Sequence, residues 1–262
     1  MMWNGNDTLP HVLELQRQRG DNFQIAEALR WLCNANRDLG LYEEGIRQAK
    51  EALNCYDQIS NTKGKLLCLN TLAFLLLSDN QFDAAENAAS RAIDIATETG
   101  QEYQLSDLHR VLGNIYRSKG EKEKAIHHYK TALEIASRFS SHALLFWTHY
   151  ALVQLFYDAH DIDNATAHIE LAKLHAANDP YKLGRAMELQ TIVWYWQSRL
   201  EDAKLEALHT LGIYEKLGAG VDARRCRDLL QSIEQKMKKQ STGFEVSFWR
   251  GFYILCLLTS TS

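Results

Sequence analysis

The sequence predicts an all-α protein built as a superhelical solenoid of about five helix pairs, and three observations lead to this prediction. The 262 residues include only 2 prolines and 14 glycines, whereas an all-β sandwich or barrel needs a turn about every 8–12 residues. Apolar residues recur three and four positions apart, as in amphipathic helices. The third observation is a 40-residue repeat, a period typical of stacked helical units.

Three sets of residues step along the chain in the same register. They are Leu32, Leu72, Leu112 and Leu152; Ala52, Ala92, Ala132 and Ala172; and Gly45, Ala85, Ala125 and Ala165. Each unit contains two amphipathic helices, as in DLHRVLGNIYRSKG followed by EKEKAIHHYKTALEIA. Such a pair can bury its apolar face only against neighbouring pairs, so the register predicts one continuous solenoid.

The same register predicts where the units begin and end. We expect a partial preceding repeat at 1–22, an array at 23–219, a capping helix at 220–239 and an unpatterned apolar tail at 240–262. The five units of the array lie near 23–60, 61–100, 101–140, 141–180 and 181–219. We interpret the half unit at the start as the sign of a fragment or a shortened gene product. The tail is interpreted either as a mis-spliced extension or as a small membrane or partner anchor.

The spacing inside a unit is similar to that of the tetratricopeptide repeat (TPR), in which small residues let two helices approach and aromatic residues fill the gaps between pairs. The third unit shows this spacing in Leu112-Gly113, Tyr116, Gly120, Ala125, Tyr129 and Ala132. Departures from it are Cys33, Val153 and Thr191 at the small position and Gln190 where leucine is expected. The period of 40 exceeds the usual TPR length of about 34 residues, which leaves HEAT and armadillo arrays as alternatives.

Longer segments resemble the TPR arrays of fungal STAND-type NTPases, the NACHT and NB-ARC class. The resemblance extends over about residues 8–238 and is carried by PHVLELQRQRGDNFQIAEALR, HRVLGNIYRSKGEKEKAIHHY and LEDAKLEALHTLGIYEKLGA. In that family the array follows a nucleotide-binding module and acts as a sensor or partner-binding surface. This sequence contains no GxxxxGK[ST] phosphate-binding motif. The resemblance therefore implies a regulatory array whose nucleotide-binding module is absent from this chain.

Composition argues against several other classes of function. The net charge of −4 gives no basic surface for nucleic acid, and the longest apolar stretch, 248–258, is too short for a membrane-spanning helix. Five cysteines without a CxxC pair indicate reduced thiols in a cytoplasmic protein. The sequence lacks an HExxH motif, a zinc-type Cys/His spacing and a nucleophile elbow. We therefore predict no enzymatic activity, no metal and no cofactor.

The first helix of each unit should line the concave groove of the solenoid and bind a peptide or a partner domain there. The candidate peptide-binding residues are Arg30, Asn34, Asn70, Arg110, Asn114, Arg117, Tyr150 and Tyr157. The exposed stripe of these helices also carries Arg37, Phe74, Trp147, Gln154, Glu188, Ile192, Tyr195 and Trp196. Arginine can grip a carboxylate and asparagine a peptide backbone, so the expected ligand is an extended acidic peptide.

Two other interpretations of this face stay open. It could be a solvated helix surface with ion pairs such as Glu27–Arg30, and its aromatic residues could belong to the core between repeats. At the level of function, the protein is predicted to be a non-enzymatic interaction scaffold. The alternative is a sensor or regulatory TPR fragment of a STAND-type NTPase.

Overall fold

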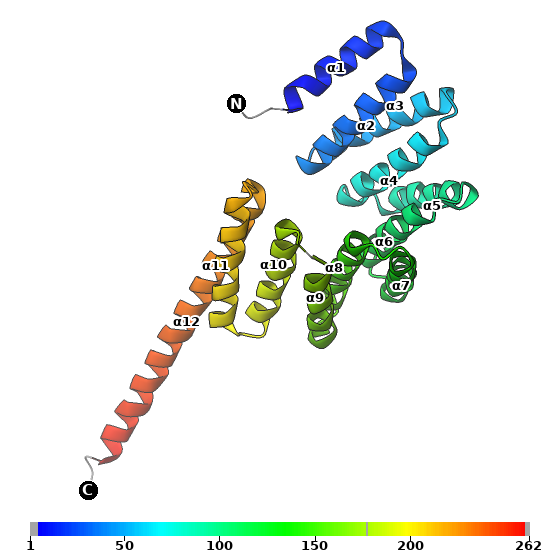
Figure 1. The fold of residues 1–262 in the computed structure, drawn as a ribbon. Helices are drawn as coiled ribbons and strands as arrows, with labels where there is room; N and C mark the ends of the chain where they lie inside the picture. Colours follow the sequence, from blue (N-terminus) through cyan, green and yellow to red (C-terminus); the bar gives the residue numbers. More distant parts are fainter. Residues whose placement is uncertain (1–4, 177, 260–262) are drawn as a thin grey trace. The chain divides into compact units, whose positions relative to one another are not determined.

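The computed structural model describes the backbone of residues 5–176 and 178–259 and the side chains of residues 9–37, 39–176 and 178–240. Helices are the only regular elements in this part of the chain, which confirms the predicted all-α class. In chain order (Figure 1) they are α1 (Gly5–Arg19), α2 (Asn22–Asp38), α3 (Tyr42–Gln58), α4 (Thr62–Ser78), α5 (Phe82–Glu98), α6 (Glu102–Ser118), α7 (Lys122–Arg138), α8 (His142–Asp158), α9 (Ile162–Ala176), α10 (Pro180–Trp196), α11 (Leu200–Lys216) and α12 (Gly220–Thr259).

The chain divides into two compact units, Met1–Ala151 and Leu152–Ser262, and the division falls within α8. Within each unit, neighbouring helices pack as antiparallel pairs in a solenoid-like arrangement. We call the first helix of a pair the A helix and the second the B helix. The A helices carry even numbers from α2 to α10, and the B helices carry odd numbers from α3 to α11.

The turns between helices explain the period of the sequence. From α2 to α7 every helix has 17 residues, and three residues connect it to the next. At the first of these turns Gly40, with a φ of 75°, donates its N–H to the carbonyl of Arg37, and Leu41 donates to that of Asn36. This is the Schellman arrangement, which satisfies the last carbonyls of a helix. Two helices and two turns give 40 residues.

The three sets of residues that define the register are all buried. The four leucines expose only 3–7% of their surface, and the four alanines are completely buried. Ala85, Ala125 and Ala165 are likewise fully buried, and a Cβ on Gly45 of α3 would meet Leu75 of α4, the first helix of the next pair, at 2.8 Å. The small side chains therefore allow the close helix packing that the sequence predicts.

In the first unit the A helices form the inner layer. Helix α4 contacts α2 and α6 as well as its neighbours α3 and α5, so consecutive A helices lie side by side. One apolar core extends from Leu13 to Ile115. Helix α1 packs on α2, and Arg17 forms an ion pair of 2.5 Å with Glu51 of α3. This layering brings residues of successive A helices next to one another.

In the second unit, α10, α11 and α12 share a separate core around Tyr214, Cys226 and Ile233. The sequence predicts that the last helix ends at 239, but α12 continues to Thr259. No proline interrupts this stretch, so its backbone hydrogen bonds can continue. The side chains of the predicted apolar tail lie outside the described residues from 241 onward.

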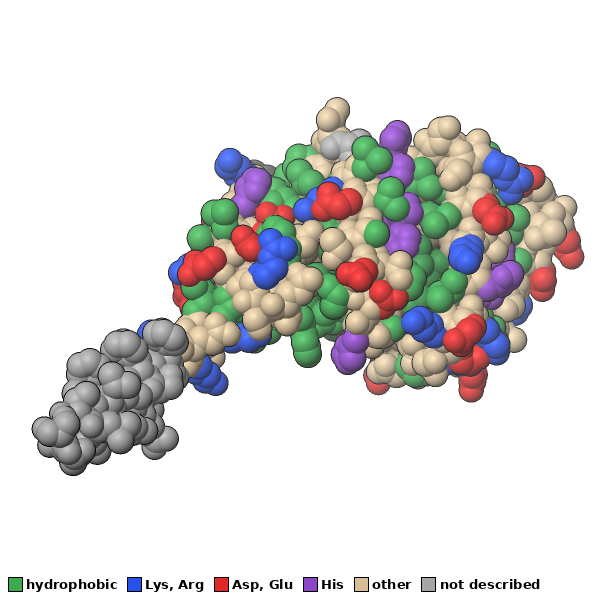
Figure 2. Space-filling model, turned by 90° about the horizontal axis from the view of Figure 1, so that it is seen from below, with side chains coloured by type: hydrophobic (Ala, Val, Ile, Leu, Met, Phe, Trp, Pro, Cys, Tyr) green, Lys and Arg blue, Asp and Glu red, His purple; other side chains and the backbone are tan. Residues whose placement is uncertain are grey.

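The surface of the described residues is mixed in character. Acidic, basic and hydrophobic side chains are interspersed on the face that Figure 2 shows. Among the described residues, no helix combines the length and apolarity that crossing a membrane requires.

Three buried tyrosines pack directly against glycines of a neighbouring helix. Tyr129 of α7 covers Gly113 of α6, where an added Cβ would lie 2.4 Å from the ring atom Cε1. Tyr56 covers Gly64, and Tyr214 covers Gly184, in the same way. Since the Tyr129 ring is fully buried, it cannot move aside without disturbing its neighbours.

We expect Gly113→Ala to lower the free energy of unfolding by about 1–3 kcal/mol, because overpacking outweighs the better helix propensity of alanine. Urea unfolding followed by circular dichroism measures the change. Gly212→Ala in α11 is the control, since a Cβ there meets nothing within 4 Å. It should stabilise the protein by up to about 1 kcal/mol. Equal effects of the two substitutions would show that the Tyr129 contact is absent.

Candidate functional site

A pocket on the A helices of the first unit contains two of the candidate residues. It has a volume of about 430 Å³, and four successive A helices line it. Its lining residues are Arg37 of α2, Asn70, Thr71 and Phe74 of α4, Asp107 and Arg110 of α6, and Trp147 of α8. We call it the groove pocket.

Asp107 is the centre of the polar contacts in the groove pocket. Arg110 donates to its Oδ1 through Nε and Nη2, at 3.1 and 2.5 Å, and Asn70 donates to its Oδ2 at 2.9 Å. Burial alone would raise the pKa of Asp107, but the charge of Arg110 and these hydrogen bonds outweigh it, so the pKa is lowered. The carboxylate is therefore ionised and holds both side chains in place.

Two groups in the pocket keep unused hydrogen-bonding capacity. The Arg110 guanidinium lies over the ring of Phe74, 5.1 Å from its centroid, and both of its hydrogen bonds go to Asp107. A guanidinium has five N–H donors, so most of its donors remain. The Oδ1 of Asn70 is buried and accepts no hydrogen bond within the described residues.

The contacts of Arg110 occur again two repeats earlier. Arg30 forms an ion pair with Glu27 at 2.7 Å and lies 4.8 Å from the ring of Trp31. The hydroxyl of Tyr56 also donates to Glu27, at 2.6 Å. The hydrogen bonds from Arg30 and Tyr56, together with the charge of Arg30, outweigh burial and lower the pKa of Glu27. The ion pair named as an alternative interpretation is thus present, and Arg30 and Arg110 are each held by a carboxylate three residues before them.

The predicted asparagines have protein partners. Asn114 accepts a hydrogen bond of 2.8 Å from the hydroxyl of Tyr129, and Asn34 accepts one of 3.4 Å from Thr71. Arg117 is partly buried on α6. Asn114 therefore fixes the helix pair α6–α7, while Asn34 lies next to a pocket residue.

The two predicted tyrosines belong to different units. The ring of Tyr150 lies 5.7 Å from that of Trp147 and 6.1 Å from that of Phe146. Tyr157 lies in the second unit, with its ring 5.9 Å from that of Trp196. Of the eight candidates, the structure thus brings Asn70 and Arg110 into one pocket.

The eight candidates leave out five residues that line the groove pocket. Arg37, Phe74 and Trp147 belong to the predicted exposed stripe, but Thr71 and Asp107 do not. A signal for Asp107 was present in the sequence, because Asp107 precedes Arg110 by three residues as Glu27 precedes Arg30. Thr71 carries no signal of this kind.

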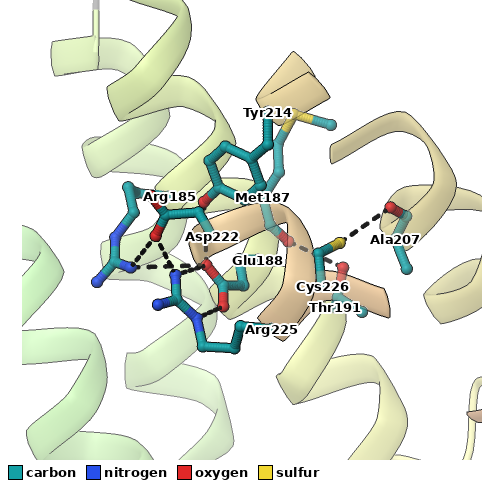
Figure 3. A network of polar contacts seen from close by, with 9 residues as sticks. All are labelled: Arg185, Met187, Glu188, Thr191, Ala207, Tyr214, Asp222, Arg225 and Cys226. Atoms are coloured by element: carbon teal, nitrogen blue, oxygen red, sulfur yellow. Dashed lines mark hydrogen bonds and ion pairs between the residues drawn. The ribbon is translucent and has the colours of Figure 1, made fainter. Parts of the chain in front are cut away.

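The second unit contains a network of four charges around the buried Glu188 (Figure 3). Glu188 of α10 accepts hydrogen bonds from Arg225 of α12, through Nε and Nη2, and from the hydroxyl of Tyr214 at 3.0 Å. Asp222 contacts Arg225 at 2.6 Å and Arg185 at 3.3 Å. Since Glu188 exposes only 5% of its surface, its charge depends on these partners. The network fastens α12 to α10.

A pair of histidines joins α6 to α7. The Nδ1 atoms of His109 and His128 lie 3.0 Å apart, and the His128 ring is parallel to that of Tyr116 at 5.2 Å. One Nδ1 must donate and the other accept, so the contact is lost when both rings carry a second proton. Burial and the nearby His109 and His127 lower the pKa of His128 from 6.5 to about 4. In the described part of the chain, no three His, Cys, Asp or Glu side chains are grouped to hold a metal ion.

The buried cysteines are poor nucleophiles. Cys33, Cys68 and Cys226 are free thiols. Burial raises the pKa of Cys33 to about 12 and that of Cys226 to about 11, and it also raises that of Cys68. Only the thiolate attacks, so these side chains are inert at neutral pH.

Comparisons with known proteins agree with this architecture. Two models of the tetratricopeptide repeat family match residues 24–98 and 106–139. A search of curated proteins gives no match. Stacked helix pairs with buried small residues at their crossings define an α-helical repeat protein. Residues 24–98 and 106–139 are thus tetratricopeptide repeats, and the family matches decide against the HEAT and armadillo alternatives.

Several solved structures have a similar fold. BtubC from P. vanneervenii is 19% identical with a TM-score of 0.60, over 88% of this chain and 90% of that one. A Rap protein complexed with competence and sporulation factor is 17% identical with a TM-score of 0.65, over 89% and 70%. A STAND protein with a tetratricopeptide repeat sensor, from Pyrococcus horikoshii, is 19% identical with a TM-score of 0.60, over 83% and 34%. The array thus resembles the TPR part of a STAND protein, as the sequence predicts.

The histidine pair generates a prediction on pH. Because the pKa of His128 is lower in the folded protein than its ordinary 6.5, the unfolded chain takes up the proton first on acidification. The contribution of this pair to stability is therefore complete above about pH 6.5 and falls towards about pH 4. His128→Phe keeps a flat ring beside Tyr116 but cannot titrate.

Melting temperatures across this pH range should fall less steeply for His128→Phe than for the parent. The control is His11→Gln, since His11 is an exposed histidine on α1 and lies outside this pair. Its profile should follow that of the parent. Parallel profiles for His128→Phe and the parent would contradict the role of the pair.

We expect Arg225→Ala to destabilise the second unit by about 1–3 kcal/mol, because Glu188 loses two charge-assisted hydrogen bonds in a buried position. Hydrogen exchange of the α12 amides should show the loss locally. Arg224→Ala, an exposed neighbour, should have no such effect. The double variant Glu188→Gln/Arg225→Ala should recover part of the loss, since it leaves no unpaired charge. If α12 exchanges as slowly in Arg225→Ala as in the parent, the network does not fasten the helix.

Proposed function

We propose that the chain is a non-enzymatic interaction scaffold whose A helices in the first unit bind an extended, acidic segment of a partner protein. TPR arrays are in general non-catalytic scaffolds for protein interactions, and solenoids bind along their concave surfaces. The candidate contacts are those predicted from the sequence. Arg30 and Arg110 bind carboxylates, Asn34, Asn70 and Asn114 face the peptide backbone, and Arg117 and Tyr150 extend the surface within the first unit.

The observation that carries this proposal is the charge of the groove. The face formed by α2, α4 and α6 carries Arg30, Arg37, Arg110 and Arg117 against the two carboxylates Glu27 and Asp107. The chain as a whole has a net charge of −4. A local excess of positive charge on an acidic protein favours an acidic ligand and speeds its association.

The proposal is tested with a displayed library of random peptides selected on the purified protein. We expect the selected peptides to carry net negative charge and to bind more weakly in higher salt. One charge-assisted hydrogen bond is worth about 1.5–3 kcal/mol, so Arg110→Ala should lower the affinity for a selected peptide roughly tenfold to a hundredfold. The double variant Arg30→Ala/Arg110→Ala should weaken it further. Calorimetric titration gives the affinities.

Arg47→Ala is a matched control, because Arg47 on the B helix α3 also forms an ion pair with a glutamate three residues before it, Glu44. Loss of such a pair outside the groove should leave the affinity unchanged. If the double variant binds the selected peptides as tightly as the parent does, the arginines do not form the site. If no peptide is enriched, the groove is not a peptide-binding surface.

A second candidate function is that of a sensor or regulatory array of a STAND-type NTPase. It is supported by the fold similarity to the STAND protein with a TPR sensor, of which this chain covers 34%. Sequencing of transcripts that contain the array provides the test. A GxxxxGK[ST] motif in the same reading frame supports this candidate, and transcripts without one argue for the scaffold alone.

We also propose a cytoplasmic location, since Cys33, Cys68 and Cys226 are free thiols, as expected in a reducing compartment. Microscopy of a fluorescent fusion tests the location. A signal from the secretory pathway would contradict it.

A further inference from the structure

The groove pocket has two aromatic walls. Phe74 of α4 and Trp147 of α8 both line it. Its volume of about 430 Å³ is in the range of ligand-binding pockets. Two aromatic walls favour a flat apolar side chain, because stacked or edge-on rings gain energy beyond that of buried area.

The polar part of the pocket lies directly beside this aromatic part. The guanidinium of Arg110 is 5.1 Å from the ring centroid of Phe74, and its hydrogen bonds to Asp107 leave other donors unused. A carboxylate can therefore bind Arg110 without displacing Asp107. An extended peptide advances about 3.3 Å per residue, so the acidic residue of the ligand must lie within about two positions of the aromatic one.

The backbone of such a ligand would also meet an unused group. The Nδ2 of Asn70 is committed to Asp107, and the buried Oδ1 lacks a donor within the described residues. Asn70 is thus left as an acceptor, which suits a peptide N–H. Burying an unsatisfied carbonyl is unfavourable, and a donor from the ligand would relieve this.

From these contacts we infer that the groove pocket is a specificity pocket for an aromatic side chain that has an aspartate or glutamate within two positions of it in a partner peptide. This inference rests on the proposed function of the groove and names the ligand class of its central pocket. Trp147 and Phe74 hold the aromatic side chain, Arg110 binds the carboxylate, and Asn70 accepts a backbone N–H. Arg37 adds positive charge at the rim.

The experiment compares the sequences that the random peptide library yields on the parent and on Trp147→Ala. Peptides selected on the parent should share an aromatic residue within two positions of an acidic one. A synthetic copy of such a peptide should bind Trp147→Ala at least tenfold more weakly, while Trp147→Phe should retain most of the affinity. Trp31→Ala is the matched control, because Trp31 also lies beside a groove arginine but outside the pocket.

The outcomes separate this inference from the proposed function. Acidic peptides without an enriched aromatic residue would overturn the pocket assignment and leave the proposed binding of acidic peptides to the groove unaffected. So would a selected peptide that binds Trp147→Ala and the parent equally. The absence of any enriched peptide would overturn the groove itself. Circular dichroism and melting of each variant identify losses of binding that are caused by unfolding. If Trp147→Ala unfolds, the affinities of Trp147→Phe and Trp31→Ala are compared instead.

Discussion

The three-residue turn that closes each helix is the constraint on which the rest of the first unit depends. Every turn from Gly40 to Ser140 contains one residue with a φ between 48° and 77°, and this residue ends each helix after the same 17 residues. Equal helices bring residues 40 positions apart to the same place on successive A helices. Since each residue turns an α-helix by about 100°, one inserted residue would rotate the groove positions of the following repeat away from the pocket.

The aligned positions serve both the array and its groove. Asn70 reaches Asp107 of the next A helix, and Glu188 reaches Arg225 of the helix two further on, each across 37 residues. The same position of the repeat therefore links neighbouring repeats in both units, once by an amide and once by an ion pair of a buried glutamate. A substitution at this position changes the packing of repeats as well as the surface. A measured loss of binding therefore has to be compared with the stability of the same variant.

Much of the fold could be predicted from the sequence because each of the five repeats has the same packing requirements. A small residue at Ala125 or Ala165 has one explanation when it recurs at every crossing. The left-handed backbone at Ser60 and His160 could not be predicted from residue type. Only the place of these two residues in the repeat indicates it. In the site, the residue types of Arg110 and Asn70 were informative, but their partners depend on contacts between repeats. From the sequence alone Asp107 is not distinguishable from an ordinary surface acid, because its role depends on the contact with Asn70 of α4.

The ion pairs inside the groove change what kind of recognition it can provide. Glu27 and Asp107 neutralise part of the charge of Arg30 and Arg110, which reduces long-range attraction and its dependence on salt. They also hold each guanidinium in one orientation, so less side-chain entropy is lost when a ligand binds. A fixed arginine beside an aromatic wall discriminates by geometry, whereas a mobile one would accept any anion. Preorganisation by the carboxylates therefore favours selectivity over raw affinity in this groove.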